Sequence, residues 1–153
     1  MNSELLQAIL SREDELLDLP VHQISLLFAS LSRFLAMLGE EDEKLNKAFN
    51  AFKAGFADKL VKSELDIHDV SALAMPLAAE KVESGKLWSR LARIVLDKNH
   101  KIPEEEYLQT VSNLAWAFSK VNHTDDRDFW LFIERAFKTE LEKLEVDDQL
   151  PKQ

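Results

Sequence analysis

Cysteine is absent from this chain of 153 residues, and glycine and proline are scarce, with three and four residues. Without cysteine the chain cannot form disulfides, thiolate nucleophiles or cysteine-based zinc sites. The scarcity of glycine and proline favours long helices over many strands and turns. No uninterrupted apolar run reaches the roughly 18 residues of a membrane span, so we expect none.

Motifs of catalysis and nucleotide binding are missing as well. Three glycines cannot build a nucleotide fingerprint, and neither a Gly-x-Ser-x-Gly elbow nor a His-Glu-x-x-His pattern occurs. The acidic runs at 40–43 and 125–128 lack the residue order of a calcium loop and fit helix starts, where carboxylates complement the helix dipole. We therefore expect no enzyme activity, cofactor, metal site or small-molecule substrate.

Negative charge is concentrated at the two ends of the chain. The net charge of −9 comes mostly from residues 1–20, which carry −4, and residues 123–149, which carry −5. An acidic surface repels phosphate backbones and anionic membranes, and it favours basic partners. We expect charge reversal at Glu140, Glu142 and Glu145 to weaken assembly with such a partner. The first twenty residues have the pattern of neither a secretory signal nor an Arg-rich transit peptide.

Apolar residues recur at spacings of three and four through most of the chain, which predicts helices. The expected helices cover about 2–11, 20–37, 40–61, 66–82, 87–98, 103–121 and 125–144. The acidic stretch of residues 11–18 is expected to contain a turn. Gly39 is predicted to end its helix in a left-handed conformation, Asp66 to cap the next start, and Thr124 or Asp125 to cap the last helix.

Three of these segments align without a gap: Val21–Phe34, Ile67–Glu80 and Leu108–Val121. Ser25, Ser71 and Ser112 then occupy one position, at intervals of 46 and 41 residues, within the range of two-helix repeats. We predict an all-α fold, a short α-solenoid of about three helical hairpins with an N-terminal capping helix. The expected domain covers 1–146, with units at 19–62, 65–100 and 103–144 and a flexible tail at 147–153. Amphipathic helices that resemble one another by chance are the alternative.

The third unit resembles a known family. The stretch from Val111 to Lys120, Val-Ser-Asn-Leu-Ala-Trp-Ala-Phe-Ser-Lys, followed by a polar loop and Asp128-Phe129-Trp130, is similar to the heptatricopeptide-type helical repeats of FAST-kinase-like and RAP-associated organellar proteins. The resemblance implies an α-solenoid that resides in mitochondria or plastids and acts on organellar RNA or ribosomes. The acidic surface differs from the basic surfaces usual in such RNA binders.

Candidate contact residues are basic or aromatic. Trp88 and Trp116 are expected in the core, whereas Trp130 is expected to be partly exposed because neighbouring apolar residues already supply a buried stripe. An exposed tryptophan can anchor a protein partner or stack on a base. The basic run can contact phosphate or an acidic partner, although a solvated helix face is the favoured explanation. The predicted contact residues are Lys86, Arg90, Arg93, Lys98, Lys101 and Trp130.

We predict a non-enzymatic helical-repeat scaffold or adaptor, a small structural subunit of a mitochondrial protein or ribonucleoprotein complex. By resemblance alone it is mitochondrial, and otherwise it is cytoplasmic. Its partners are other proteins of the complex with basic surfaces. The alternative is an RNA-binding repeat module of organellar RNA metabolism or the mitoribosome, which would use the basic run at 86–101 and bind RNA less tightly as salt increases.

Overall fold

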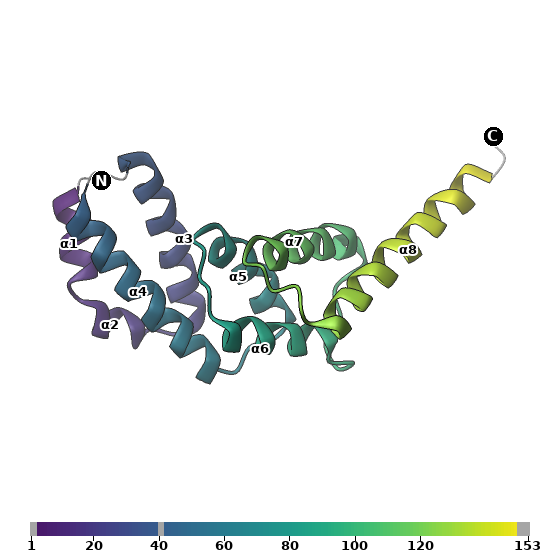
Figure 1. Cartoon of the computed structure of the whole chain (residues 1–153), viewed down its shortest axis with the longest axis horizontal. Coiled ribbons are helices and arrows are strands. Elements are labelled where there is room, and N and C mark those ends of the chain that lie inside the picture. Colours follow the sequence, from purple (N-terminus) through teal and green to yellow (C-terminus); the bar gives the residue numbers. More distant parts are fainter. Residues whose placement is uncertain (1–2, 40–41, 150–153) are drawn as a thin grey trace.

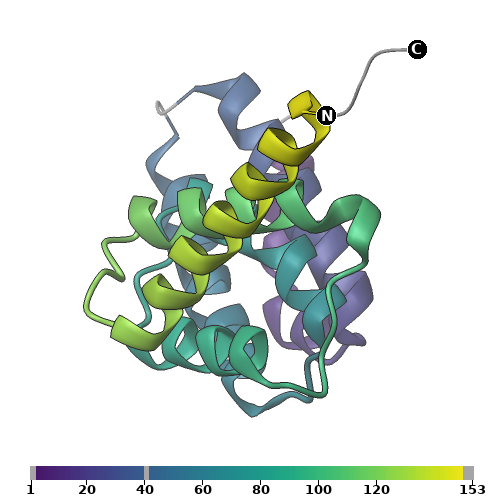
Figure 2. The same ribbon diagram turned by 90° about the vertical axis from the view of Figure 1, so that its right-hand side faces the viewer.

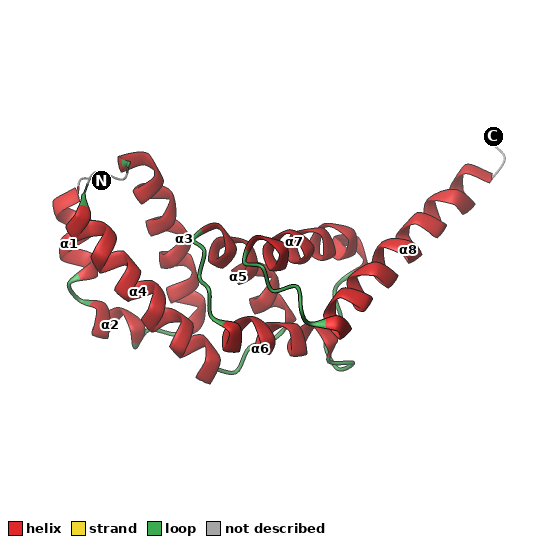
Figure 3. Ribbon diagram, in the orientation of Figure 1, coloured by secondary structure: helices red, strands yellow, loops and turns green. Residues whose placement is uncertain are grey.

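A computed structural model describes residues 3–39 and 42–149 of the chain. Within these ranges the protein consists of α-helices, one short 3-10 helix and connecting loops, and it has no strand (Figure 3). This confirms the predicted all-α class. The helices are α1 (Ser3–Leu10), α2 (Glu13–Leu17), α3 (Val21–Leu38), α4 (Glu43–Lys62), α5 (Ile67–Ala79), α6 (Gly85–Leu96), η1 (Glu104–Glu106), α7 (Tyr107–Lys120) and α8 (Arg127–Gln149).

The turn predicted within residues 11–18 is present at Ser11 and Arg12, and a short helix that the sequence did not predict, α2, follows it at Glu13–Leu17. Its first turn consists of Glu13, Asp14 and Glu15, whose carboxylates complement the helix dipole. Helix α2 packs on α4 at Gly55, where an added Cβ would lie only 2.6 Å from Leu17 Cδ1. The glycine therefore provides the room that α2 needs.

Helix ends follow local capping rules, with one correction. Asp66 and Asp69 form a reciprocal capping box at the start of α5, as predicted for Asp66. The last helix is capped by Asp126, whose Oδ1 accepts from the backbone N–H of Phe129 at 3.2 Å, and not by the residues expected. Gly39 has the predicted positive φ of 79°, but its ψ of 177° is extended. The expected helix start at 40–41 lies outside the described residues.

The capping box makes stability depend on pH. The hydrogen bond from the backbone N–H of Asp69 holds the pKa of Asp66 below its usual 3.8. Because this pKa is depressed in the folded state, its stabilisation is complete above about pH 4 and is lost as the pH falls through the folded-state pKa. We expect Asp66→Asn, which can still cap the helix, to flatten this part of the acid-unfolding curve measured by circular dichroism. An unchanged curve would contradict the assignment.

The helices are arranged in two rows. In one row α3 packs on α5 and α5 on α7, and in the other α4 packs on α6 and α6 on α8. Helices α1 and α2 both pack on α4 at the N-terminal end (Figure 1). Helix α8 continues to Gln149 and projects from the opposite end of the molecule.

One apolar core runs through both rows. At the N-terminal end the Phe28 ring of α3 lies 5.7 Å from Phe49 and 5.1 Å from Phe56 of α4. Further along, the Trp88 ring of α6 meets Phe118 of α7 edge-on at 4.9 Å between centroids. These aromatic contacts tie each row to the other.

Helices α5 and α7 end in the same way. Lys81 and Asn122 follow them with positive φ angles of 53° and 58°. The backbone N–H groups of the next residues, Val82 and His123, donate hydrogen bonds to the carbonyl oxygens five residues earlier, at 3.0 and 2.9 Å. This is the pattern of a Schellman motif. These pairs occupy equivalent positions in the sequence alignment of the two segments.

Length and composition alone would allow α3 to cross a membrane, since its 18 residues have a mean hydropathy of 1.4. The core helix of a water-soluble protein meets the same criteria, and Ile24, Phe28 and Leu31 of α3 are buried in the core here. The feature alone therefore does not place α3 in a bilayer, and the absence of a span stays a prediction.

Candidate protein-binding surface

The predicted basic residues are only partly brought together. Lys86, Arg90 and Arg93 lie on one face of α6 and, with Val61 of α4, line a cleft of about 670 Å³. Lys98 and Lys101 are exposed but lie in the segment after α6, outside the lining of this cleft. The structure therefore supports a smaller basic surface than the sequence predicted.

Arg90 has a structural role that the sequence did not reveal. Its guanidinium donates hydrogen bonds to the backbone oxygens of Val61 and Ser63, at the end of α4. These carbonyls have no partner within a regular helix end, so Arg90 satisfies them and fastens α4 to α6. Only Lys86 and Arg93 keep free exposed charges at the cleft.

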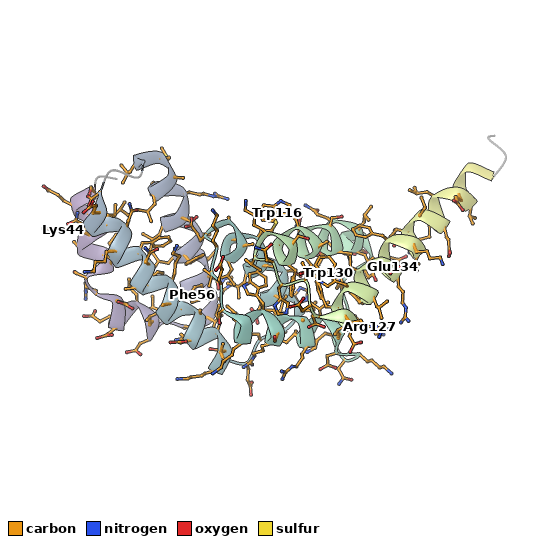
Figure 4. The ribbon with its side chains drawn as sticks, in the orientation of Figure 1. Lys44, Phe56, Trp116, Arg127, Trp130 and Glu134 are labelled. Carbon is orange, nitrogen blue, oxygen red and sulfur yellow. The ribbon has the colours of Figure 1, made fainter. Side chains whose placement is uncertain are left out.

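The three tryptophans occupy three environments. Trp88 is buried, as predicted, and its Nε1–H donates to the Val82 carbonyl at 2.7 Å. Trp130 is half-buried, as predicted, and donates to the His123 carbonyl at 3.1 Å. The prediction that Trp116 lies in the core is wrong, since it is 44% exposed. Figure 4 shows it on the side of α7 turned away from α6.

An uncovered face on α7 becomes visible when α7 is compared with α5. Ile67, Ala74 and Ala78 of α5 are 0–4% exposed, and α5 packs extensively against α7. The equivalent residues of α7 are less covered: Leu108 is 47% exposed, Ala115 is half-buried and Ser119 is exposed. The surface that α5 buries is therefore exposed on α7, because no further helix of the described residues continues the row beyond α7.

Helix α8 repeats this relation to α6. Trp88, Ala92 and Val95 of α6 are buried, and Trp88 touches α7. The equivalent residues of α8 are the half-buried Trp130, the exposed Glu134 and Phe137, which is 36% exposed. In Figure 2, which looks onto this end of the molecule, α8 crosses the front and no other described helix covers it.

The uncovered surface extends along the projecting part of α8, residues 137–149, which we call the arm. Leu141 and Leu144 of the arm are each more than half exposed, and their spacing from Phe137 places all three on one side of the helix. We define the terminal face as these exposed positions of α7 and α8 together. It consists of Leu108, Ser112, Ala115, Ser119, Trp130, Glu134, Phe137, Leu141 and Leu144.

Charged groups of both signs border the terminal face, and the basic Lys138 is exposed next to Phe137. Glu134 lies within it, and among the described residues it forms no ion pair (Figure 4). Glu142 and Glu145 are exposed on the arm, and Glu140 pairs with Lys143 at 3.1 Å. The hydrogen bond to Glu140 also raises the pKa of Lys143, so this lysine is less available to a partner.

A second cleft, of about 400 Å³, lies beside the arm. It is lined by Leu96 of α6, Tyr107 of α7, and Asp128, Leu131 and Arg135 of α8, among others. Burial, and to a lesser extent the nearby Glu140 carboxylate, raise the pKa of Tyr107, which keeps the phenol protonated at neutral pH. The cleft adds a polar margin to the same end of the molecule.

Sequence reasoning identified Trp130 but missed the rest of the terminal face. The signal was present, because the alignment placed Leu108, Ala115 and Ser119 opposite α5 residues with a stacking neighbour. No protein-family model, curated protein or solved structure matches the chain. Function is therefore inferred from these surfaces.

Proposed function

We propose that the protein is a non-enzymatic helical-repeat scaffold that binds another protein through its terminal face. In this proposal the chain is a short α-solenoid of three hairpins, α3–α4, α5–α6 and α7–α8, preceded by α1 and α2. The protein acts by shape and surface, as a structural subunit of a larger complex. It needs no cofactor and no small-molecule substrate.

The repeat interpretation is supported by features that recur at equivalent positions. Helices in each row pack on the next member of the same row, as expected when two-helix units stack. Trp88 and Trp130 donate to the backbone just before their helices, and α5 and α7 share their C-terminal motif. These shared hydrogen bonds favour a repeat over chance similarity of amphipathic helices.

The observation that carries the proposal is the exposure of the terminal face. Terminal units of repeat arrays usually present a polar outer side, because an uncovered stacking surface lowers solubility. Here Leu108, Phe137, Leu141 and Leu144 remain exposed at one end. Contiguous exposed apolar side chains of this kind mark interaction sites.

Residence in mitochondria rests on a different argument. We propose it from the resemblance of residues 111–130 to repeats of FAST-kinase-like and RAP-associated proteins. The acidic composition, with a net charge of −9, favours a basic protein neighbour such as those that accompany RNA. The resemblance thus suggests the complex, and the terminal face suggests the mode of attachment.

Affinity purification from the native source tests this function. With a tag at the N-terminus, away from the terminal face, we expect a stoichiometric protein companion that survives nuclease treatment. Size-exclusion chromatography of the eluate should place both proteins in one peak. Recovery of the chain alone, as a monomer, would contradict the scaffold proposal.

RNA binding is the second candidate, favoured by the basic cleft of α6. We expect an RNA-binding protein to lose affinity as salt increases, and Lys86→Glu with Arg93→Glu to weaken binding by about tenfold or more. Lys44→Glu with Lys47→Glu is the matched control, since both lysines are exposed on α4. Fluorescence anisotropy with a labelled single-stranded RNA measures both pairs. Equal effects of the two pairs, or no binding at low salt, would eliminate the cleft as an RNA site.

A further inference from the structure

We propose that the occupant of the terminal face is an α-helix of a partner protein with an apolar stripe flanked by lysine or arginine. The helix packs beside α7 as an additional member of the row α3, α5 and α7. This inference rests on the proposed scaffold function and specifies the chemistry of the partner.

The shape of α7 favours a helix as the occupant. Ser112, Ala115 and Ser119 occupy the positions of Ser71, Ala74 and Ala78, which are small residues of α5. Small side chains allow two helix backbones to approach closely, and α5 and α7 do pack extensively. A helix placed on α7 in the same way would continue an arrangement that already exists within the chain.

The arm provides the second side of this site. Phe137, Leu141 and Leu144 extend the line that starts at Trp130, at spacings of seven, four and three residues. Apart from Glu134, this side of α8 is therefore apolar from the body of the protein to well along the arm. A helix that contacts α7 with one side would contact this stripe with its neighbouring side.

The charge of the terminal face indicates which residues border the apolar stripe of the partner helix. Ala92 of α6 is fully buried where α8 has Glu134, so a helix covering the terminal face brings this carboxylate into a drier environment. A buried carboxylate is costly unless a cation pairs with it. Glu142 and Glu145 add exposed negative charge along the arm. Lysine or arginine on the partner would pair with Glu134, which lies in the stripe, and with Glu145, which lies beside it, whereas Glu142 projects from another side of α8.

A second copy of this chain fits the same surface poorly. Two terminal faces in a twofold contact would bring like carboxylates together, since an isologous interface pairs the same patch with itself. Glu134 and the arm glutamates would face their own equivalents, between two chains that each carry −9. Like charges opposed across an interface disfavour association.

Synthetic helices test the inference on the full-length protein. Two peptides of about 20 residues share one Leu/Ala stripe, flanked by lysines in the first and by glutamates in the second. A third has the lysines but serine in place of leucine. We expect calorimetry to detect binding of the first peptide only, with an affinity that falls as salt increases.

Two variants locate the binding. Leu141→Ser removes an exposed apolar contact and keeps every charge. We expect it to lower the affinity of the protein for the lysine-flanked peptide by about tenfold. Glu134→Lys should lower the affinity for the same peptide to a similar degree and raise the affinity for the glutamate-flanked peptide. Both side chains are exposed, and circular dichroism confirms that the variants fold.

The outcomes separate this inference from the scaffold function. Equal binding of both charged peptides, or of the serine peptide, would overturn the inference. The inference would also be overturned if analytical ultracentrifugation showed a dimer of the protein that Leu141→Ser abolishes. The occupant of the terminal face would then be a second copy of the chain. A protein companion in native purification together with no peptide preference would retain the scaffold and reject the basic helix. Neither companion nor peptide binding would reject both.

Discussion

The Trp88→Ala variant is expected to lose about 3–5 kcal/mol of unfolding free energy, the usual cost of deleting a large aromatic ring from a core. The side chain is 1% exposed, meets Phe118 of α7 edge-on, and donates a hydrogen bond to the Val82 carbonyl. Its removal opens a cavity between α6 and α7 and leaves that carbonyl without its partner. Urea denaturation followed by circular dichroism measures the loss.

Trp130→Ala provides the matched control, because Trp130 makes the equivalent backbone hydrogen bond and contacts Phe129 edge-on. It is half-buried, however, whereas Trp88 is almost completely buried. We expect a loss of about half that of Trp88→Ala or less, since less apolar area is exposed to water on unfolding. Equal losses would show that the two tryptophans are not in different environments.

Phe137→Asp combined with Leu141→Asp is expected to abolish co-purification of the protein companion. Each side chain would act as an apolar anchor in the complex, and loss of one such anchor weakens binding by about 30-fold or more. The fold should survive, because both side chains are already exposed. Quantitative affinity purification measures the retained companion, and thermal denaturation confirms the stability of the variant.

Leu26→Asp combined with Met37→Asp is the control for this pair. Leu26 is 59% exposed, close to the 58% of Leu141, and both control residues lie on α3 at the other end of the row. We expect these changes to leave the companion bound. Comparable loss with both pairs would contradict the assignment of binding to the terminal face.

Periodicity predicted the long helices well, because spacing of three and four reports which side of a helix is apolar. It did not predict what covers that side. Trp116 and Leu108 belong to apolar positions that resemble core positions in the sequence, yet both are exposed because no described helix follows α7 in its row. The exposure of a helix face depends on whether another helix covers it, which the residues of one helix do not report.

The basic site shows the same limit at the level of single contacts. The spacing of Lys86, Arg90 and Arg93 predicted a shared face on α6, and the structure has it. The partners of Arg90 are backbone carbonyls 27 and 29 residues earlier in the chain, at the end of α4. Contacts between a side chain and a distant backbone leave no trace in residue type, so the structural role of Arg90 required the fold.

The projecting arm also provides a way to observe the binding of a partner to the terminal face. A single helix in water opens and closes readily, because an isolated helix of this length is marginally stable without packing. Backbone amides of residues 137–146 should therefore exchange with solvent deuterium faster than those of α5, which is packed on both sides along its row. Occupancy would slow this exchange, so the arm serves as a built-in indicator of whether the surface beside it is covered.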